Sequence, residues 1–212
     1  MPPSSAPKAA PLELMSGGSA GPGHQAGGFA TTWSTEWIYN GTVDDSGLVA
    51  TDASPNHSGG MWVCGAAPLP PTGAHYIEVV FGGDPAGHEY MAIGVWGGKR
   101  SPGKLGVAQR ELTKGGVPFW GLRGDDDSDA LRVKGKGKGK VGRDSKGCAI
   151  SKRDRIGMLA DMDGCSLTFF RNGKPIERAV VRGFPKGNDM RIAACTHGTG
   201  ATITLAFPAK PQ

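Results

Sequence analysis

The sequence predicts an all-β protein in which two antiparallel sheets pack face to face as a sandwich. The chain has 36 glycines and 16 prolines in 212 residues, and both residue types disfavour helix interiors. No stretch shows the apolar periodicity of an amphipathic helix of ordinary length. About ten short apolar runs separated by turn residues are present instead, as is typical of a β-sandwich.

The first part of the chain differs in composition from the rest. Residues 1–30 are mostly Pro, Gly, Ala and Ser, with almost no large apolar side chains. Such a segment cannot offset its ordering entropy by burial, so we predict a disordered tail. Aromatic and β-branched residues become frequent from Thr31-Thr32-Trp33. We therefore predict a single domain over residues 31–208 and a short C-terminal tail at 209–212.

The predicted strands are short and follow one another closely. In chain order they are residues 47–51, 61–64, 75–81, 90–96, 119–122, 130–133, 155–161, 166–171, 174–181, 190–195 and 202–207. In the third strand Tyr76 and Glu78 alternate with Ile77 and Val79, so each pair should occupy one face of the sheet. The fourth strand is apolar nearly throughout, as expected of a strand buried on both faces.

Two turn signals stand close together in the second half of the domain. Asn172-Gly173 interrupts an apolar run, and Asp163-Gly164 lies a few residues earlier. A type I′ turn needs positive φ at both central residues, which Asn-Gly and Asp-Gly tolerate best. We therefore predict two primed turns that join three strands over residues 155–181 into a β-meander.

Four stretches of this sequence, in the same order, resemble motifs of the SPRY domain family. They are HYIEV at 75–79, MAIGV at 91–95, WG at 120–121 and IGMLADMDGCSLTFFRNG at 156–173, and the match covers residues 45–207. Ile77 stands where the family usually has tryptophan. The resemblance implies a bent two-sheet β-sandwich. It also implies a non-enzymatic protein–protein interaction module that binds a segment of a partner protein through loops at one end of the sandwich.

In resembling domains a shallow pocket is lined by three loops, which fall here at residues 52–56, 96–100 and 196–197. The partner-binding candidates carried over by position are Asp52, Pro55, Asn56, Trp96, Arg100, Thr196 and His197. The polar members offer hydrogen bonds to an extended peptide, and Trp96 offers an apolar anchor unless it belongs to the core. The alternative is that these loops only close the ends of the sandwich.

A second binding class rests on a basic run. Lysines alternate with glycines over residues 133–142, at Lys134, Lys136, Lys138 and Lys140. Such a loop could lie along phosphates without reading sequence, which makes nucleic-acid or polyanion binding the alternative function. A solvated surface loop is the simpler interpretation. Carbohydrate binding is a third possibility, and it rests only on the sandwich shared with lectins.

Several motifs that would indicate catalysis or a bound ion fail on inspection. The GKGKVG run at 137–142 matches a dinucleotide fingerprint in letters but lacks the strand and helix around it. The acidic run at 125–129 starts like a calcium loop, but Ala130 and Lys136 replace the required Gly and Glu. The five histidines show no metal spacing. We therefore expect no enzyme activity, no metal and no cofactor.

The cysteines and the start of the chain indicate the compartment. The four cysteines form no C-x-x-C pair, and Met1 is not followed by a charged and then an apolar segment. No apolar run is long enough to span a bilayer. We expect an intracellular monomer of the cytoplasm or nucleus without membrane contact. Its net charge of +5 permits acidic partners.

Overall fold

The computed structural model describes residues 32–55, 60–83, 90–102, 118–125, 132–134, 153–187 and 189–206, to which all structural statements refer. The strands are β1 (Trp33–Tyr39), β2 (Gly41–Val43), β3 (Val49–Asp52), β4 (Met61–Gly65), β5 (Ala74–Gly82), β6 (Tyr90–Trp96), β7 (Phe119–Asp125), β8 (Arg132–Lys134), β9 (Arg155–Asp161), β10 (Ser166–Arg171), β11 (Lys174–Arg182), β12 (Arg191–Thr196) and β13 (Thr202–Ala206). No α-helix occurs within these ranges, which include no span able to cross a membrane as a helix. The predicted tails at 1–30 and 209–212 lie outside them.

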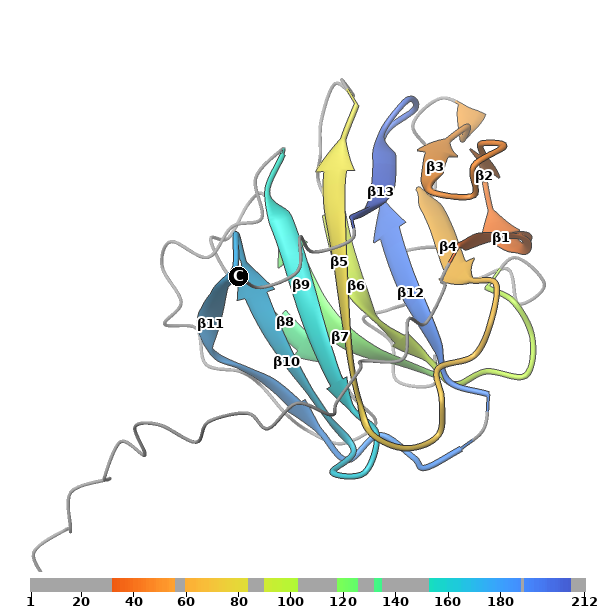
Figure 1. The fold of residues 1–212 in the computed structure, drawn as a ribbon. Coiled ribbons are helices and arrows are strands. Elements are labelled where there is room, and N and C mark those ends of the chain that lie inside the picture. The colour runs from red at the N-terminus through yellow and green to blue at the C-terminus, as the bar shows by residue number, and fades with distance from the viewer. Residues whose placement is uncertain are drawn as a thin grey trace, which may run out of the picture.

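The strands form two antiparallel sheets that face each other, as Figure 1 shows. The six-stranded sheet has the order β1-β4-β12-β6-β7-β8, and the seven-stranded sheet has the order β11-β10-β9-β5-β13-β3-β2. β1 and β2 belong to different sheets although only Asn40 separates them. Asn40 has a φ of 53°, a conformation that Asn tolerates better than most residues. The predicted two-sheet sandwich is confirmed.

The main core lies between the two sheets. It contains Val63, Ile93 and Ile192 from the six-stranded sheet, and Phe81, Met158 and Ile203 from the seven-stranded sheet. Full burial of one such side chain stabilises the fold by about 1.5–3 kcal/mol.

The alternation predicted along β5 is confirmed. Ile77 and Val79 are buried in the core, whereas Tyr76 on the other face is 36% exposed. Glu78 shares the face of Tyr76 but is buried, because the Tyr76 hydroxyl and the Arg155 guanidinium both donate hydrogen bonds to its carboxylate. A buried carboxylate requires such partners.

The turn after β10 is the predicted type I′ turn. Asn172 and Gly173 have φ values of 51° and 77°. Asn172 also accepts a hydrogen bond from the Arg155 backbone N–H through its side-chain oxygen at 2.9 Å. Its amide nitrogen donates to Asp154 at 2.9 Å. Asn172 therefore sets the turn and also fastens it to the start of β9.

The second predicted primed turn, at Asp163-Gly164, is wrong. The connection spans the four residues between Asp161 and Ser166, which pair directly, and the positive φ of 48° falls on Cys165. Side-chain hydrogen bonds explain the longer loop. The Asp161 carboxylate accepts the Gly164 N–H at 2.9 Å, so it caps the loop from inside.

An observed strand differs from its predicted bounds where a side chain accepts hydrogen bonds from backbone N–H groups. We predicted a strand at 47–51, but β3 begins at Val49. The Asp44 carboxylate accepts the N–H groups of Leu48 and Val49, each at 3.0 Å, which extends the preceding turn. The bounds of β6, β9 and β10 agree with the prediction.

Candidate functional site

The structure does not bring all the predicted partner-binding residues to one end of the sandwich. β12 runs antiparallel to its neighbour β6, so that Arg191 pairs with Trp96 and Cys195 pairs with Ala92. The loop after β6 therefore lies beside the start of β12, at the opposite end from Thr196 and His197. A single pocket formed by both loops is excluded by this pairing. Binding by the individual residues stays a prediction.

One group of predicted residues does come together, at the upper end of the sandwich in Figure 1. We call it the Asp52 rim and define it as residues 52–55 with residues 196–200. Asp52 ends β3 and is only 1% exposed. Its carboxylate accepts the Ser54 N–H at 2.8 Å and the Gly198 N–H at 3.1 Å. One buried side chain thus ties two loops that lie far apart in the sequence.

Further hydrogen bonds fasten the two loops of the Asp52 rim. The Thr199 hydroxyl donates to the Ser54 carbonyl at 2.7 Å, and the Gly200 N–H donates to the Asp52 carbonyl at 2.8 Å. The Ala53 N–H donates to the Asn40 carbonyl at 2.8 Å. These bonds fix the loop backbones before any partner arrives, which lowers the ordering cost of binding.

The side chains of the Asp52 rim fall into two groups. Asp52 and Thr196 are buried and support the loops from inside. Pro55 is exposed and His197 is half-buried, so these two lie at the surface. Asn56 is outside the described residues.

Trp96 lies at the other end of the sandwich and is completely buried, which favours its alternative assignment to the core. It belongs to an aromatic cluster on the outer face of the six-stranded sheet, where its ring centroid is 6.1 Å from that of Trp62. Phe119 packs edge-on against Trp62 at 5.2 Å. The indole N–H of Trp96 donates to the Arg100 carbonyl at 3.0 Å. Trp96 therefore supports the loop that carries Arg100.

The turn after Trp96 requires glycine. A Cβ atom on Gly98 would lie 2.6 Å from the Trp96 indole nitrogen and 2.9 Å from the Pro118 ring. Any larger residue would push the loop off the indole. The next two residues, Lys99 and Arg100, are both exposed. The glycine thus allows a tight turn that places two cations side by side at the surface.

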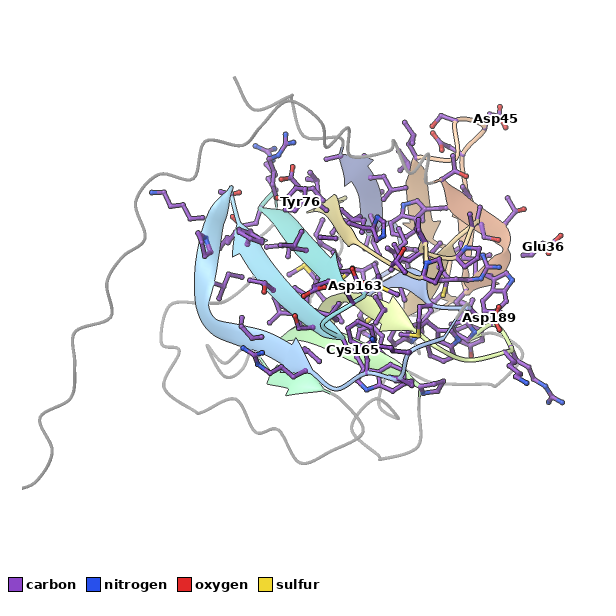
Figure 2. The ribbon with its side chains drawn as sticks, turned by 60° about the horizontal axis from the view of Figure 1, so that its bottom comes forward. Glu36, Asp45, Tyr76, Asp163, Cys165 and Asp189 are labelled. Atoms are coloured by element: carbon purple, nitrogen blue, oxygen red, sulfur yellow. The ribbon has the colours of Figure 1, made fainter. Side chains whose placement is uncertain are left out.

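A bulge in β1 brings another aromatic residue to the same region. The register of β1 on β4 shifts between Trp33 and Ile38. Within the bulge the Ser34 hydroxyl accepts the N–H groups of Glu36 at 3.2 Å and Trp37 at 3.1 Å. Figure 2 shows the Glu36 side chain projecting away from the strands. The bulge also breaks the regular hydrogen-bonding edge of the sheet, which discourages pairing with other chains.

Between this bulge and the loop after β6 lies a shallow recess of about 300 Å³, which we call the Arg100 recess. It is lined by Glu36, Trp37, Lys99, Arg100 and Ser101. Of these five residues, only Arg100 was predicted to bind a partner from the sequence. The sequence contains the tryptophan of β1 and the two adjacent cations at 99–100, but neither segment carries a signal that the two lie close together in the fold.

The basic run is only partly within the described residues. Lys134 ends β8 and pairs through its backbone with Gly121. Lys136, Lys138 and Lys140 lie outside the described part of the chain. Polyanion binding by this run stays a prediction.

Potential metal ligands and reactive side chains were compared within the described ranges. No group of three or more His, Cys, Asp or Glu side chains among these residues is arranged to hold a metal ion. Burial raises the pKa of the Cys64 thiol well above its usual range, which suppresses the nucleophilic thiolate. Burial and the hydrogen bond to Glu78 raise the pKa of Tyr76 to about 12, so this phenol stays protonated at neutral pH.

Comparison with solved structures places this architecture among SPRY domains. The SPRY domain of human HERC1 aligns with a TM-score of 0.59 and 13% identity, over 85% of this chain and 99% of that one. The PSpry domain of TRIM65 aligns at 0.55 and 18%, over 84% and 92%. A human SPRY domain aligns at 0.53 and 16%, over 82% and 99%. The chain therefore has a SPRY-like fold. No family model and no curated protein matches its sequence.

Proposed function

We propose that this protein is a non-enzymatic interaction module that binds an extended segment of a partner protein at the Asp52 rim. The observation that carries the proposal is the buried Asp52 carboxylate, which joins the Ser54 and Gly198 backbones into one surface. A loop pair fixed in this way binds with little loss of conformational entropy. The SPRY-like fold supports the same function, because the family resemblance implies binding through loops at one end of the sandwich.

The contacts expected at the rim follow from exposure. Pro55 is exposed and conformationally restricted, so a partner can pack on it at low entropic cost. His197 is half-buried and presents part of its ring to the partner. Asp52 acts through the loops it holds and does not itself touch the partner, because its side chain is buried.

A peptide selection tests the proposal with matched controls. Peptides that bind the purified domain would be selected from a displayed random library. Their affinities would then be measured for the unchanged domain and for the His197→Ala and Pro55→Ala variants. The controls are His75→Ala, also half-buried, and Pro68→Ala, also exposed, both at the opposite end of the sandwich. The rim variants should weaken binding by about 1–3 kcal/mol each without lowering the melting temperature. Equal losses in the control variants would contradict the proposal.

A further inference from the structure

The Arg100 recess carries two cations that have no ion-pair partner among the described residues. Lys99 and Arg100 are exposed, and neither forms an ion pair with an acidic residue in the described part of the chain. Glu36 is the one acidic side chain that lines the recess. The lining therefore has two cations and one anion, so a ligand that brings negative charge is favoured.

A third cation lies next to this lining. The Arg191 guanidinium stacks on the Trp37 ring, 4.4 Å from the ring centroid. It is held there because it donates hydrogen bonds to the carbonyls of Gly65, at 2.9 Å, and Ala66. Its charge adds to the positive potential, and it also fixes the half-buried Trp37 ring as an apolar wall of the recess.

We propose that the Arg100 recess binds an acidic segment of a partner protein, as a surface separate from the Asp52 rim. A carboxylate of the segment lies between Lys99 and Arg100, where the planar guanidinium can donate two parallel hydrogen bonds. A neighbouring apolar side chain packs on Trp37. A volume of about 300 Å³ is at the small end of ligand sites, which suits one or two side chains better than a whole cofactor.

The loops that form the recess are held before binding. The hydrogen bond from Trp96 to the Arg100 carbonyl fixes one wall, and the Ser34 hydroxyl fixes the bulge that carries Trp37. Ordering on binding then falls mainly on the exposed side chains of the lining, Glu36, Lys99 and Arg100. This limits the entropic cost of capturing a flexible segment.

Charge complementarity points to another protein as the source of the segment. Residues 1–31 of this chain contain a single acidic residue, Glu13, so they match the recess poorly. Asp125, at which the acidic run 125–129 begins, is the last residue of β7, whereas Trp96 beside the recess pairs with Phe119, the first residue of that strand. The length of β7 separates Asp125 from Phe119 by roughly 20 Å.

Fluorescence anisotropy with a labelled peptide of alternating Glu and Leu tests this inference. A peptide with Gln in place of Glu is the matched probe. The Glu peptide should bind more tightly, and the double variant Lys99→Gln, Arg100→Gln should weaken it by roughly tenfold or more. Glu36→Gln should tighten it, because it removes the opposing charge.

A matched charge control separates a specific site from general attraction. Arg182 and Lys186 are exposed and do not line the recess, so the double variant Arg182→Gln, Lys186→Gln lowers net charge equally. This control should leave the affinity unchanged. An equal loss in the control, or equal affinity for the Gln peptide, would overturn the inference.

Two further measurements would show whether the Arg100 recess binds a ligand other than an acidic protein segment. If light scattering shows a dimer that dissociates in the Lys99 and Arg100 variant, the recess binds a second copy of this chain and the inference is wrong. If a single-stranded oligonucleotide binds more tightly than the peptide and depends on the same two residues, the ligand is nucleic acid. Neither result bears on the Asp52 rim, so this inference and the proposed function can fail separately.

Discussion

Replacing Asp52 by Ala should destabilise the domain and loosen both loops of the Asp52 rim. The buried carboxylate accepts the N–H groups of Ser54 and Gly198, and Ala offers no acceptor in its place. A buried N–H left without a partner costs about 1–3 kcal/mol. Water that enters the site would satisfy part of the two N–H groups and so reduce their combined cost. We therefore expect a loss of about 2–4 kcal/mol in the free energy of unfolding. Asp52→Asn keeps one acceptor oxygen and should lose about half as much.

Urea denaturation followed by tryptophan fluorescence measures this loss, with the slope against denaturant expected to stay constant. Asp44 supplies a matched control, because its carboxylate also accepts two backbone N–H groups, those of Leu48 and Val49. Asp44 is exposed, so water can replace its hydrogen bonds and Asp44→Ala should cost clearly less. Equal losses in the two variants would refute the argument that burial gives Asp52 its importance.

Three further predictions concern other parts of the molecule. Trp96→Ala should destabilise the fold by about 3–5 kcal/mol in the same denaturation assay, as expected for a buried aromatic; a loss near zero would return Trp96 to a surface role. Because Tyr76 has its pKa raised to about 12 while an unfolded tyrosine ionises near 10, the folded form retains the proton longer and stability should fall as pH rises from about 10 to about 12. Tyr76→Phe should reduce that slope in urea denaturation at each pH, and an unchanged slope would contradict it. If the basic run binds nucleic acid, its affinity for a labelled oligonucleotide should fall steeply with salt and disappear when all four lysines become Ser; salt-independent binding would exclude it. The four are Lys134, Lys136, Lys138 and Lys140.

The parts of the fold that could be predicted from sequence are those set by local chemistry. A type I′ turn requires positive φ at both central residues, and Asn172-Gly173 tolerates this, so the turn type could be predicted from two residues. The alternation of Tyr76 with Ile77 and Val79 fixed which face of β5 is buried. The residue preferences of turns and the alternation of side chains along a strand act within a few residues, so both can be predicted without a structure.

Features set by single side-chain hydrogen bonds to the backbone, or by strand direction, were missed or misplaced. The turn at Asp163-Gly164 lengthened because the Asp161 side chain captures a backbone N–H. The bulge in β1 depends on the Ser34 hydroxyl. A sequence motif places a loop after a strand but does not state the strand's direction. The loops after β6 and β12 were therefore assigned to one end, although the two strands are antiparallel neighbours.

The two candidate surfaces illustrate the same limit. Asp52 and His197 were proposed from the resemblance, and the structure places both at the Asp52 rim. The sequence did not show that Asp52 would be buried, since that depends on the Gly198 backbone folding over it. Trp37 and Lys99 in the Arg100 recess come from β1 and from the loop after β6. Because β4 and β12 separate β1 from β6 in the sheet, the proximity of Trp37 and Lys99 depends on how the β1 bulge and the loop after β6 fold toward each other.

Amide chemical-shift mapping can locate the binding of a partner segment at the Asp52 rim residue by residue. A selected peptide would be titrated into the isotopically labelled domain and the shift of every assigned N–H recorded. If the segment binds at the rim, the largest changes should occur at Ser54, Gly198, Thr199 and Gly200, whose N–H groups belong to the rim. Largest changes on an outer sheet face, or at the opposite end of the sandwich, with the rim unaffected, would contradict it.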